Sequence, residues 1–506
     1  MTLACAHRGD SSAFRENTIA AITSAISKGA DIVEIDVRLT SGGDVVVLHD
    51  PTLERLWGLP QEINKTDLET VRKLGYDDVR IPLLSEVLPL FIGTSSVLMI
   101  DMEVAEPARA AFDVVARGTL PLSQITWCGD LDGMRIIRSL SKEARIWLPW
   151  NELGVPPQSL LEEVKPEIIN SYFGYLDRAT VSAIHDLGYK VSAWTVNDIP
   201  TMRWASAIGI DSVTSDRLEN LKEVIASAPV LDQGGAQPQP LSQLNLDEAM
   251  DVARTLGQWA IVAMTHIDPG QMMLKTNAAD IVTVIDLLIE RHVREVIAAN
   301  FVGHSFVGEE YGGKPQSGVP EWYLDPVDGT TNFANRLPWN SFSLALSYDN
   351  TPLLGVVVHP WLATLYEAQQ GKGALRNGQP LRIEDRAAEN PLSSRVVSTE
   401  LAAYQPWPGM LKLLEGLAEN FCTMRIMGSG TLTLTSVAAG QSVGSVIGHF
   451  SPIDHLAAVI IVKEAGGVVL DEDGNENLFP SRGGVLCATK SAAGPLYEMW
   501  KSAISS

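Results

Sequence analysis

The segment that most constrains how this chain folds is APVLDQGGAQPQPLSQ, which begins at Ala228. It is rich in glycine, glutamine and proline and shows no hydrophobic periodicity, which is typical of a linker between domains. The chain has 506 residues, which is too many for one ordinary hydrophobic core. We therefore predict one domain over residues 1–228, a linker over residues 229–243 and a second domain over residues 244–506.

Charge and cysteine content narrow the function classes. The net charge is −23, from 38 basic and 61 acidic residues, and such a charge repels nucleic acid and anionic membranes and suits bound cations. The four cysteines are too scattered for a zinc site or a disulfide framework, which predicts a reducing, cytoplasmic setting. The start, MTLACAHRGD, lacks the pattern of a signal peptide, and no apolar run is long enough to cross a bilayer. We expect small-molecule partners, neither nucleic acid nor membranes, and leave a homodimer open.

Hydrophobic patterns differ on the two sides of the linker. Before it, strand-like runs such as DIVEIDVRL, SVLMIDMEV and YKVSAWTV alternate with amphipathic helical patterns. That alternation is typical of parallel βα units, and the length suits a TIM-type (β/α)8 barrel. After it, helical patterns flank a strand-rich middle that contains SFSLALSYD and PLLGVVVHP. We predict a layered α/β or α+β fold for the second domain.

The first acidic cluster lies in the stretch DIVEIDVRLT. Glu34 and Asp36 share one face of this strand, because side chains alternate with a period of two. Two close carboxylates in a barrel mouth repel each other unless a cation sits between them, and a hard divalent ion suits oxygen ligands. Asp101, in SVLMIDMEV, could supply a third ligand.

Two histidines and an arginine complete this first group. His7 and His49 each end an apolar run, where barrel enzymes carry their catalytic residues. Two imidazoles beside a metal would make a general acid and a general base, and Arg8 could hold a phosphate in a forked contact. Taken singly, alternating acids usually mark a solvated sheet face, and a lone histidine is usually structural, so the prediction depends on the combination.

Taken together, these elements resemble the glycerophosphodiester phosphodiesterases over roughly the first 225 residues. The motifs are AHRGDSSAFRENT, DIVEIDVRLTSGGDVVVLHDPTLER, IPLLSEVL, AWTVND and VTSDRLENL. The resemblance implies a TIM-type barrel that hydrolyses a phosphodiester to a phosphomonoester and an alcohol with Mg²⁺ or Ca²⁺. It also implies site residues: His7 and His49 as acid and base, Arg8 as a phosphate ligand, and Glu34, Asp36 and Asp101 as metal ligands.

One residue departs from the pattern of this family. The family usually has Glu-x-Lys on the third of these strands, and here Asp101 and Glu103 stand at the two positions. Asp101 can still bind metal with a shorter reach, whereas Glu103 cannot offer a cation to phosphate. Either another cation substitutes, or this half is slow, altered in substrate or inactive.

A second acidic cluster surrounds WYLDPVDGTTNF, in which the chain bends at Pro326 and gains backbone freedom at Gly329. Carboxylates from three segments could meet a main-chain carbonyl here and bind two or three Mg²⁺ ions, which activate water for attack on a phosphate ester. The candidate ligands are Glu309, Glu310, Asp325, the Val327 carbonyl, Asp328 and Asp454. Thr330 could orient the water and Asp286 could accept its proton. Alone, Asp286 and Asp454 also fit as helix-capping acids, and DPVDGT fits an ordinary turn.

The order and spacing of five motifs resemble the inositol monophosphatase family over roughly residues 245 to 500. They are KTNAADIVTVID, GHSFVGEE, WYLDPVDGTTNF, MGSGTLTLTSVAAG and IDHLAAVIIVKEAGG. The resemblance implies a layered α/β sandwich with Mg²⁺-dependent, Li⁺-sensitive phosphomonoesterase activity. It implies the metal ligands Glu309, Asp325, Val327 (carbonyl), Asp328 and Asp454, the water-activating pair Thr330 and Asp286, and phosphate donors at Gly329 and Thr330.

Two departures from this family concern the substrate. The aromatic residue usually found before the last metal acid is Ile453 here, and the acid that grips inositol hydroxyls falls at Ile447. An apolar side chain cannot accept those hydrogen bonds, so we expect poor selectivity for inositol phosphate.

A diesterase and a monoesterase on one chain suggest consecutive steps, from diester to monoester to free alcohol and phosphate. The diester could be glycerophosphoinositol or a sugar phosphodiester, and we favour a polyol or sugar without choosing between them. Two alternatives stay open for the barrel. In the first it only binds a phosphate ester, which Glu103 favours. In the second it acts as a lyase or transferase that releases a cyclic phosphate, as in the sphingomyelinase D type of barrel.

Overall fold

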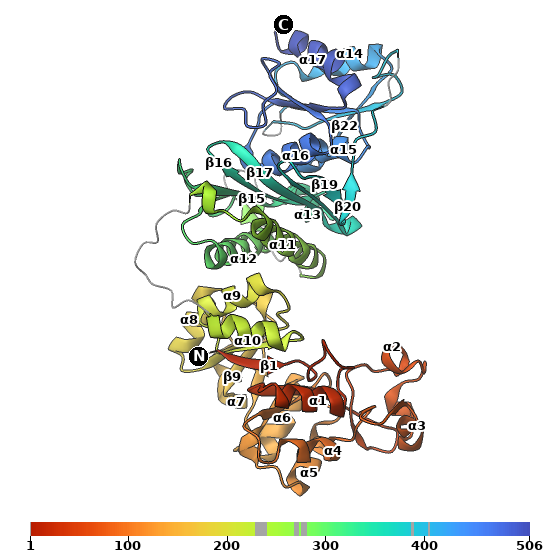
Figure 1. Cartoon of the computed structure of the whole chain (residues 1–506), viewed down its shortest axis with the longest axis vertical. Coiled ribbons are helices and arrows are strands. Elements are labelled where there is room, and N and C mark those ends of the chain that lie inside the picture. The colour runs from red at the N-terminus through yellow and green to blue at the C-terminus, as the bar shows by residue number, and fades with distance from the viewer. Residues whose placement is uncertain are drawn as a thin grey trace. The chain divides into compact units, whose positions relative to one another are not determined.

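In the computed structural model the chain divides into two compact units, Met1–Gln233 and Gly234–Ser506. The structure describes residues 2–227, 240–267, 273–274, 281–385, 389–402 and 405–505 (Figure 1). Most of the predicted linker, residues 229–243, lies outside the described residues, as does the stretch KTNAAD at residues 275–280. The limits that we predicted for the two domains and the linker therefore stay predictions.

The N-terminal unit is a nearly closed barrel of parallel strands in the order β7-β6-β2-β1-β11-β10-β9-β8. The strands are β1 (Leu3–Ala6), β2 (Ile32–Leu39), β6 (Val97–Met102), β7 (Ile125–Gly129), β8 (Trp147–Pro149), β9 (Ile168–Tyr172), β10 (Lys190–Trp194) and β11 (Ser212–Ser215). A parallel bridge between Trp127 and Ile146 joins the two ends of this order. The prediction of a TIM-type barrel is confirmed.

Helices follow most of the barrel strands and cover the outside of the barrel. They are α1 (Ile19–Ser27), α5 (Ala108–Arg117), α6 (Leu131–Leu140), α7 (Gln158–Val164), α8 (Arg178–Asp186), α9 (Ile199–Ile208) and α10 (Leu218–Ser227). Local sequence explains several helix starts, because the side chains of Thr18, Asp130, Asp177 and Asp198 accept hydrogen bonds from backbone N–H groups of the first turn.

A small subdomain leaves the barrel after β2. Strand β3 (Val45–Val47) pairs with β2 in antiparallel fashion and leads into it. The subdomain contains α2 (Glu54–Trp57), α3 (Leu68–Arg72), β4 (Gly75–Tyr76), β5 (Val79–Arg80) and α4 (Leu84–Val87). Its own apolar cluster, which includes Val46, Leu53 and Val71, fixes the turn that carries His49 at the barrel mouth.

The C-terminal unit alternates helices and sheets in five layers (Figure 1). The larger sheet has the order β14 (Ser305–Gly308), β15 (Pro320–Asp328), β16 (Ser341–Tyr348), β17 (Thr351–His359), β18 (Thr364–Gln369), β19 (Gly373–Arg376) and β20 (Gln379–Leu381). The smaller sheet has the order β22 (Thr423–Ile426), β21 (Val396–Thr399), β23 (Gly444–Ile447), β25 (Val485–Ala488) and β24 (Val468–Asp471). A short hairpin joins β12 (Met273–Leu274) and β13 (Ile281–Val282).

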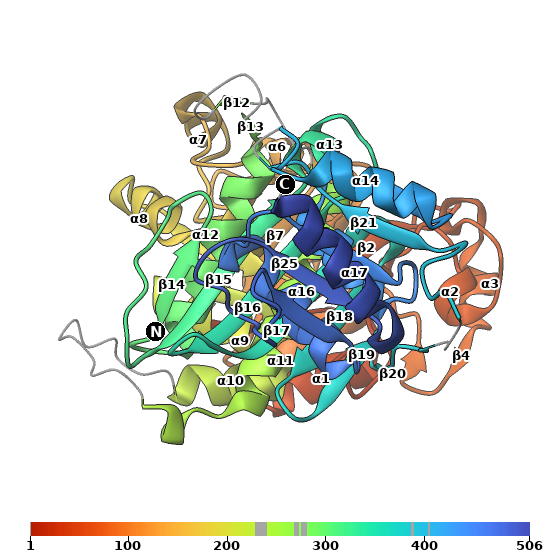
Figure 2. The ribbon, with the colours of Figure 1, turned by 90° about the horizontal axis from the view of Figure 1, so that it is seen from above.

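Helices separate and cover these two sheets. They are α11 (Leu246–His266) and α12 (Val284–Asn300) on the larger sheet, α15 (Gly430–Ala438) and α16 (Pro452–Glu464) between the sheets (Figure 1), and α14 (Met410–Glu419) and α17 (Lys490–Ile504) on the smaller sheet, where Figure 2 shows them in front. Residues Leu456–Val462 of α16 are almost wholly buried, which explains why this helix reads as apolar on all sides. The predicted layered α/β sandwich is confirmed.

Candidate active sites

The barrel strands bring the first acidic cluster together. Glu34 and Asp36 lie on β2, and the register of the sheet pairs Asp36 with Asp101 on β6. All three line one cavity of about 620 Å³, and Glu34 and Asp36 are 3% and 7% exposed. Burial raises the pKa of Asp101 to about 7, with Asp36 adding to it, and raises the pKa of Glu34 as well. Three carboxylates this close and this buried would be ionised together beside a divalent cation, so this donor set fits Mg²⁺ or Ca²⁺.

The two predicted catalytic histidines line the same cavity and are each held by a carboxylate. His7 Nδ1 lies 2.7 Å from Asp216 Oδ1, and His49 Nδ1 lies 2.8 Å from Asp50 Oδ1. Because Nδ1 is engaged on each ring, Nε2 is the atom that can exchange a proton with a substrate. This arrangement suits one histidine acting as acid and the other as base.

Asp216 and Asp50 were not among the residues that the sequence predicted. Burial alone would raise the pKa of Asp216. Its hydrogen bonds, among which the one with His7 contributes most, instead lower that pKa to about 2. The hydrogen bonds from Arg55 hold the pKa of Asp50 at about 2. A local signal for Asp50 exists, because it directly follows His49. Asp216 meets His7 through pairing of β11 with β1 at the two ends of the unit, which local sequence does not reveal.

Arg8 and Glu103 lie at the edge of this site. The Arg8 backbone N–H donates to Glu34 Oε2 at 2.7 Å, and its guanidinium contacts Glu16 at 2.9 Å and Asp36 at 3.2 Å. Its predicted contact with phosphate stays a prediction. Strand β6 ends at Met102, so Glu103 falls just beyond it and pairs with the Arg38 guanidinium. The acid at the usual lysine position therefore has a cationic partner of its own.

The second acidic cluster also converges on one cavity, of about 730 Å³. The residues that line it include the predicted ligands Glu309, Asp325, Val327, Asp328 and Asp454. Asp325 is 3% exposed, and burial followed by the charges of its three acidic neighbours raises its pKa well above the ordinary value. Four carboxylates that converge in this way fit hard divalent cations.

Asp328 is fixed to the start of α15. The N–H groups of Gly430 and Thr431 donate to its carboxylate at 3.2 and 2.9 Å, and the Ser429 hydroxyl donates to it as well. Strand β15 carries an irregularity between Asp325 and Asp328, so the DPVD stretch is the bulged end of a strand, not an isolated turn. The bulge and the helix start together orient this carboxylate into the cavity.

Thr330 and Asp286 form the contact expected of a water-activating pair. The Thr330 hydroxyl lies 3.3 Å from Asp286 Oδ1 and 2.9 Å from the Val327 carbonyl. Asp286 also closes the predicted capping box, because its Oδ2 accepts a hydrogen bond from the Thr283 N–H at 2.9 Å. Burial raises the pKa of Asp286 to about 6. The cap and the site contact therefore use different oxygens of one carboxylate.

The backbone conformation at position 329, between the predicted metal ligands and Thr330, requires a glycine. Its φ is +85°, and a Cβ there would lie 2.7 Å from the Gly428 carbonyl oxygen. The start of α16 also agrees with the sequence: Ser451 is its N-cap residue, Pro452 follows, and Asp454 lies in its first turn. Asp454 lines the cavity from that position, so the helix start and the predicted metal ligand coincide.

Another part of this cavity has an apolar side chain in its wall. Ile447 ends β23 and lines the cavity while 5% exposed, so an apolar side chain stands where an acid was expected for inositol. Glu400 lines the cavity as well, and the sequence did not point to it. It accepts hydrogen bonds from the N–H groups of Met427 and Gly428 at 3.1 and 2.8 Å, and so holds the loop that precedes α15.

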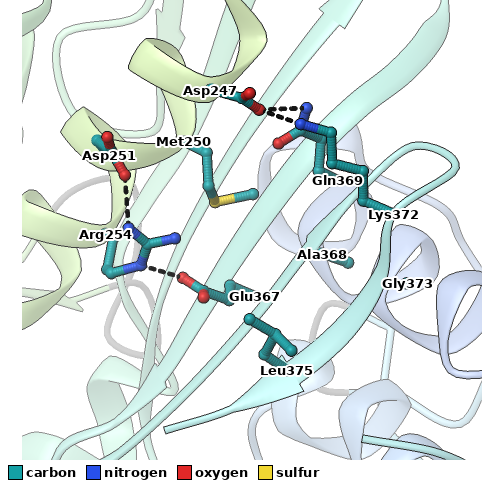
Figure 3. A pocket seen from close by; sticks show the side chains of 10 residues that line it. All are labelled: Asp247, Met250, Asp251, Arg254, Glu367, Ala368, Gln369, Lys372, Gly373 and Leu375. Carbon is teal, nitrogen blue, oxygen red and sulfur yellow. Dashed lines mark hydrogen bonds and ion pairs between the residues drawn. The ribbon is translucent and has the colours of Figure 1, made fainter. Parts of the chain in front are cut away.

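A third hollow lies between α11 and β18 (Figure 3). Its charged side chains neutralise one another. Arg254 pairs with buried Glu367 at 2.7 Å and with Asp251 at 2.6 Å. Asp247 pairs with Lys372. These mutual pairs explain the hollow as part of the packing of α11, and we assign it no chemistry.

Comparison with known proteins identifies a family for each half of the chain. The family model described as "Inositol monophosphatase family" matches residues 243–504, more than half of the chain. The chain belongs to the inositol monophosphatase family. A second model, described as "Glycerophosphoryl diester phosphodiesterase family", matches residues 7–220. The predicted fusion of a domain from each family is confirmed.

Individual relatives cover the C-terminal unit. The chain is 33% identical over 235 residues to inositol monophosphatase 2 of Homo sapiens, covering 45% of this chain and 80% of the relative. It is 35% identical over 231 residues to a fructose-1,6-bisphosphatase/inositol-1-monophosphatase of Thermotoga maritima, covering 46% of this chain and 86% of the relative.

Solved structures resemble each unit in turn. An inositol monophosphatase of Thermotoga maritima is 30% identical and covers 51% of this chain and 98% of its own, with a TM-score of 0.45. A phosphodiesterase of Oleispira antarctica, in complex with its product sn-glycerol-3-phosphate, is 27% identical and covers 45% of this chain and 98% of its own, with a TM-score of 0.41.

These findings fix the general activity. Both families hydrolyse phosphoric esters, so the chain is a hydrolase with a phosphodiesterase-type and a phosphomonoesterase-type domain. The inositol monophosphatase family depends on metal, typically Mg²⁺, and the acids of the second cavity fit that ion. Among the described residues, no helix has the length and apolar character needed to cross a membrane.

Proposed function

We propose that this chain is a bifunctional hydrolase that runs two consecutive steps. The barrel hydrolyses a glycerol-, polyol- or sugar-containing phosphodiester to a phosphomonoester, and the C-terminal unit hydrolyses that product to the free alcohol and phosphate. One observation carries the proposal: a single chain contains two separate cavities, each lined by the acids that its own step requires, with two histidines in the first cavity and Thr330, in contact with Asp286, in the second. The product class of the first step is the substrate class of the second.

In the barrel we assign the metal ligands to Glu34, Asp36 and Asp101, which would bind Mg²⁺ or Ca²⁺. When bound, such an ion stabilises negative charge on the phosphoryl oxygens. His7 and His49 exchange protons through Nε2: one ring takes a proton from the attacking water, and the other gives a proton to the leaving alcohol. Their carboxylate partners hold both rings in place. Arg8 would contact phosphate.

In the second cavity we assign two or three Mg²⁺ ions to Glu309, Asp325, the Val327 carbonyl, Asp328 and Asp454. When bound, Mg²⁺ lowers the pKa of water and stabilises the leaving oxygen. The Thr330 hydroxyl orients the attacking water, and Asp286 takes the proton through the Thr330 contact. The N–H groups of Gly329 and Thr330 hold the phosphate at the start of α13 (Thr330–Ala334).

The second site should accept a range of polyol and sugar phosphates. Ile447 offers no acceptor to a ring of hydroxyl groups, so it gives inositol phosphate no advantage over a smaller phosphomonoester. This breadth suits a monoesterase whose substrate is whatever the barrel releases.

A second candidate function concerns the barrel alone. Glu103 replaces a phosphate-binding lysine, and the Arg8 guanidinium already contacts Glu16 and Asp36. Both observations favour a barrel that binds a phosphate ester without cleaving it, while the C-terminal unit acts as a broad polyol and sugar monophosphatase.

A panel of phosphodiesters incubated with the full chain and Mg²⁺ separates these candidates. We expect at least one diester to yield both free alcohol and inorganic phosphate, with the phosphomonoester visible in between by phosphorus NMR. A cyclic phosphate product would instead indicate a lyase or transferase. If no diester is cleaved while phosphomonoesters still release phosphate, the barrel is a binding module and the two-step proposal is wrong.

The setting of the enzyme also stays a proposal. All four cysteines are buried and unpaired, which supports the prediction of a reducing cytoplasm. The homodimer also stays a prediction, as do the exact limits of the linker at residues 229–243.

A further inference from the structure

The cavity of the C-terminal unit extends beyond the residues that we assign to metal and phosphate. Its volume is about 730 Å³, and its wall also includes Glu400, Ile426, Ile447, His449 and His455. The alcohol part of a phosphomonoester must lie beside residues of this second group, because the ions and the phosphate fill the space between the others. The proposed hydrolysis gives His455 no role.

His455 directly follows the predicted metal ligand Asp454 in α16 and is 5% exposed. Consecutive side chains on a helix point about 100° apart, so the imidazole diverges from the Asp454 carboxylate. Its ring lies 5.8 Å from the Phe450 ring between centroids. A Cβ at position 430 would lie 2.7 Å from His455 Nε2, so Gly430 leaves the space that the ring occupies at the start of α15.

One hydrogen bond fixes where the proton of this imidazole lies. The Ser451 backbone N–H donates to His455 Nδ1 at 3.0 Å. A backbone N–H can only donate, so Nδ1 offers its lone pair and the neutral ring carries its proton on Nε2. Among the described residues Nε2 has no acceptor, and protein atoms do not close it off from the cavity. A buried donor that opens on a cavity suits an acceptor atom of a ligand.

Other donors of this wall are already committed. Asn332 is 9% exposed, and its Nδ2 donates to two main-chain carbonyl groups, each at 2.7 Å. The Thr330 hydroxyl donates to the Val327 carbonyl. The described residues that line the cavity include neither lysine nor arginine, and His449 is exposed. His455 therefore stands out as a buried side chain whose donor is fixed in direction and still available.

We propose that His455 Nε2 donates a hydrogen bond to an oxygen atom in the alcohol part of the phosphomonoester. This contact would favour phosphates of polyols and sugars over phosphates of alcohols that have no further oxygen. The inference rests on the proposed broad phosphomonoesterase function of the C-terminal unit. Ile447 offers no acceptor to a substrate hydroxyl, whereas His455 offers a donor, so the substrate oxygen is recognised through its lone pair.

Two pairs of phosphomonoesters with equal chain lengths test this preference with the full chain and Mg²⁺. The first pair is glycerol 1-phosphate and propyl phosphate. We expect kcat/KM for phosphate release to be about three- to tenfold higher for the glycerol ester. The second pair is 2-methoxyethyl phosphate and butyl phosphate. The ether oxygen accepts but cannot donate, so the methoxyethyl ester should be preferred as well.

Two substitutions of His455 separate its two nitrogen atoms. His455→Asn places an amide oxygen near the position of Nδ1, where it can accept from the Ser451 N–H, but it does not reach the position of Nε2. His455→Gln reaches that position with its amide and offers the Ser451 N–H no acceptor nearby. We expect the asparagine variant to lose the preference in both pairs and the glutamine variant to keep most of it. His266→Asn, at an exposed position at the end of α11, should leave both ratios unchanged.

The outcomes separate this inference from the function on which it rests. If the asparagine variant keeps the wild-type ratios, the inference is wrong. If that variant loses activity equally on all four esters, Nε2 serves the phosphate or the helix start, and the assignment to the alcohol is also wrong. If the wild type hydrolyses none of the esters, the proposed function fails, and calorimetry with glycerol 1-phosphate and propyl phosphate in the presence of Mg²⁺ then tests the contact alone. Equal affinities of the wild type for these two esters would overturn it.

Discussion

Asp325 is the carboxylate of the second cavity that depends most on a cation. It is buried with three other acids around it, and together they raise its pKa. Asp325→Asn keeps the size of the side chain and removes the charge, so we expect phosphomonoesterase activity to fall about 100-fold or more. Glu498→Gln, an equal charge change at an exposed position of α17, is the matched control. Normal hydrolysis of monoesters by the Asp325 variant would refute the assignment.

A substitution of His49 tests the catalytic roles that we propose in the barrel. His49→Ala removes one of the two proton-transfer groups and should abolish diester cleavage while leaving monoester cleavage intact. The wild-type pH–rate profile for the diester should be bell-shaped, because one imidazole must carry a proton and the other must not. Loss of both activities would point to misfolding, and full diester activity would exclude His49 as a catalytic group.

Ile447 tests the substrate preference of the second cavity. Ile447→Glu places an acceptor where inositol hydroxyls would lie, and a hydrogen bond to a buried partner is worth about 1–3 kcal/mol, or about tenfold to hundredfold in relative kcat/KM for inositol phosphate. Ile447→Leu is the matched apolar control and should leave the preference unchanged. If the glutamate variant prefers the same phosphates as the wild type, Ile447 does not set the specificity.

Individual site residues could be predicted from the sequence where neighbouring residues form a recognisable pattern. Glu34 and Asp36 share a face because a strand has a period of two, and DPVDGT places Asp325 and Asp328 on either side of one carbonyl. Asp216 was not predictable in this way, because it reaches His7 only when the last barrel strand pairs with the first. Glu400 gave no signal either, since its partners are backbone N–H groups of a distant loop.

At the scale of elements, α12 organises two parts of the second cavity. Asp286 in its first turn contacts Thr330, and Glu290 one turn later is fully buried. Glu290 accepts hydrogen bonds from the N–H groups of Glu310 and Tyr311 at 2.7 and 3.1 Å, so it holds the loop that carries Glu309.

Glu290→Gln should therefore weaken metal binding without touching a metal ligand. An amide offers one oxygen where the carboxylate offers two, so one of the two loop N–H groups loses its acceptor. We expect the dissociation constant for Mg²⁺, measured by calorimetry, to rise about tenfold. Glu419→Gln, at an exposed position of α14, serves as the control. An unchanged Mg²⁺ affinity would mean that the loop holds Glu309 by itself.

Element types followed from periodicity, but their ends required the fold. The capping box at Thr283 and the start of α16 agree with the sequence, because each uses residues three or four positions apart. The Ser451 side chain makes no capping hydrogen bond, although the residue stands at the N-cap. Strand β6 ends one residue before Glu103, since that side chain turns to Arg38 on the neighbouring strand. Such cross-strand partners are invisible to local patterns.

At the scale of the whole molecule, both domains belong to one chain, so every preparation of the enzyme contains the two sites in equal numbers. A small phosphomonoester that leaves the barrel therefore always has a second site in the same chain, whose local concentration is set by the tether. The two steps should then be separable by mutation but not by purification.

Asp454→Asn should stop the two-step reaction at its intermediate. The variant loses a metal ligand at the start of α16 and keeps the barrel unchanged, so a cleavable diester should yield free alcohol and an accumulating phosphomonoester. Addition of the His49→Ala chain, which has the second site but no diesterase, should restore phosphate release, because the intermediate is a free small molecule. Phosphorus NMR follows diester, monoester and phosphate in one sample. If the Asp454 variant alone still releases phosphate from the diester, the two domains serve separate substrates, because the phosphate would then come from a route that does not use the second site.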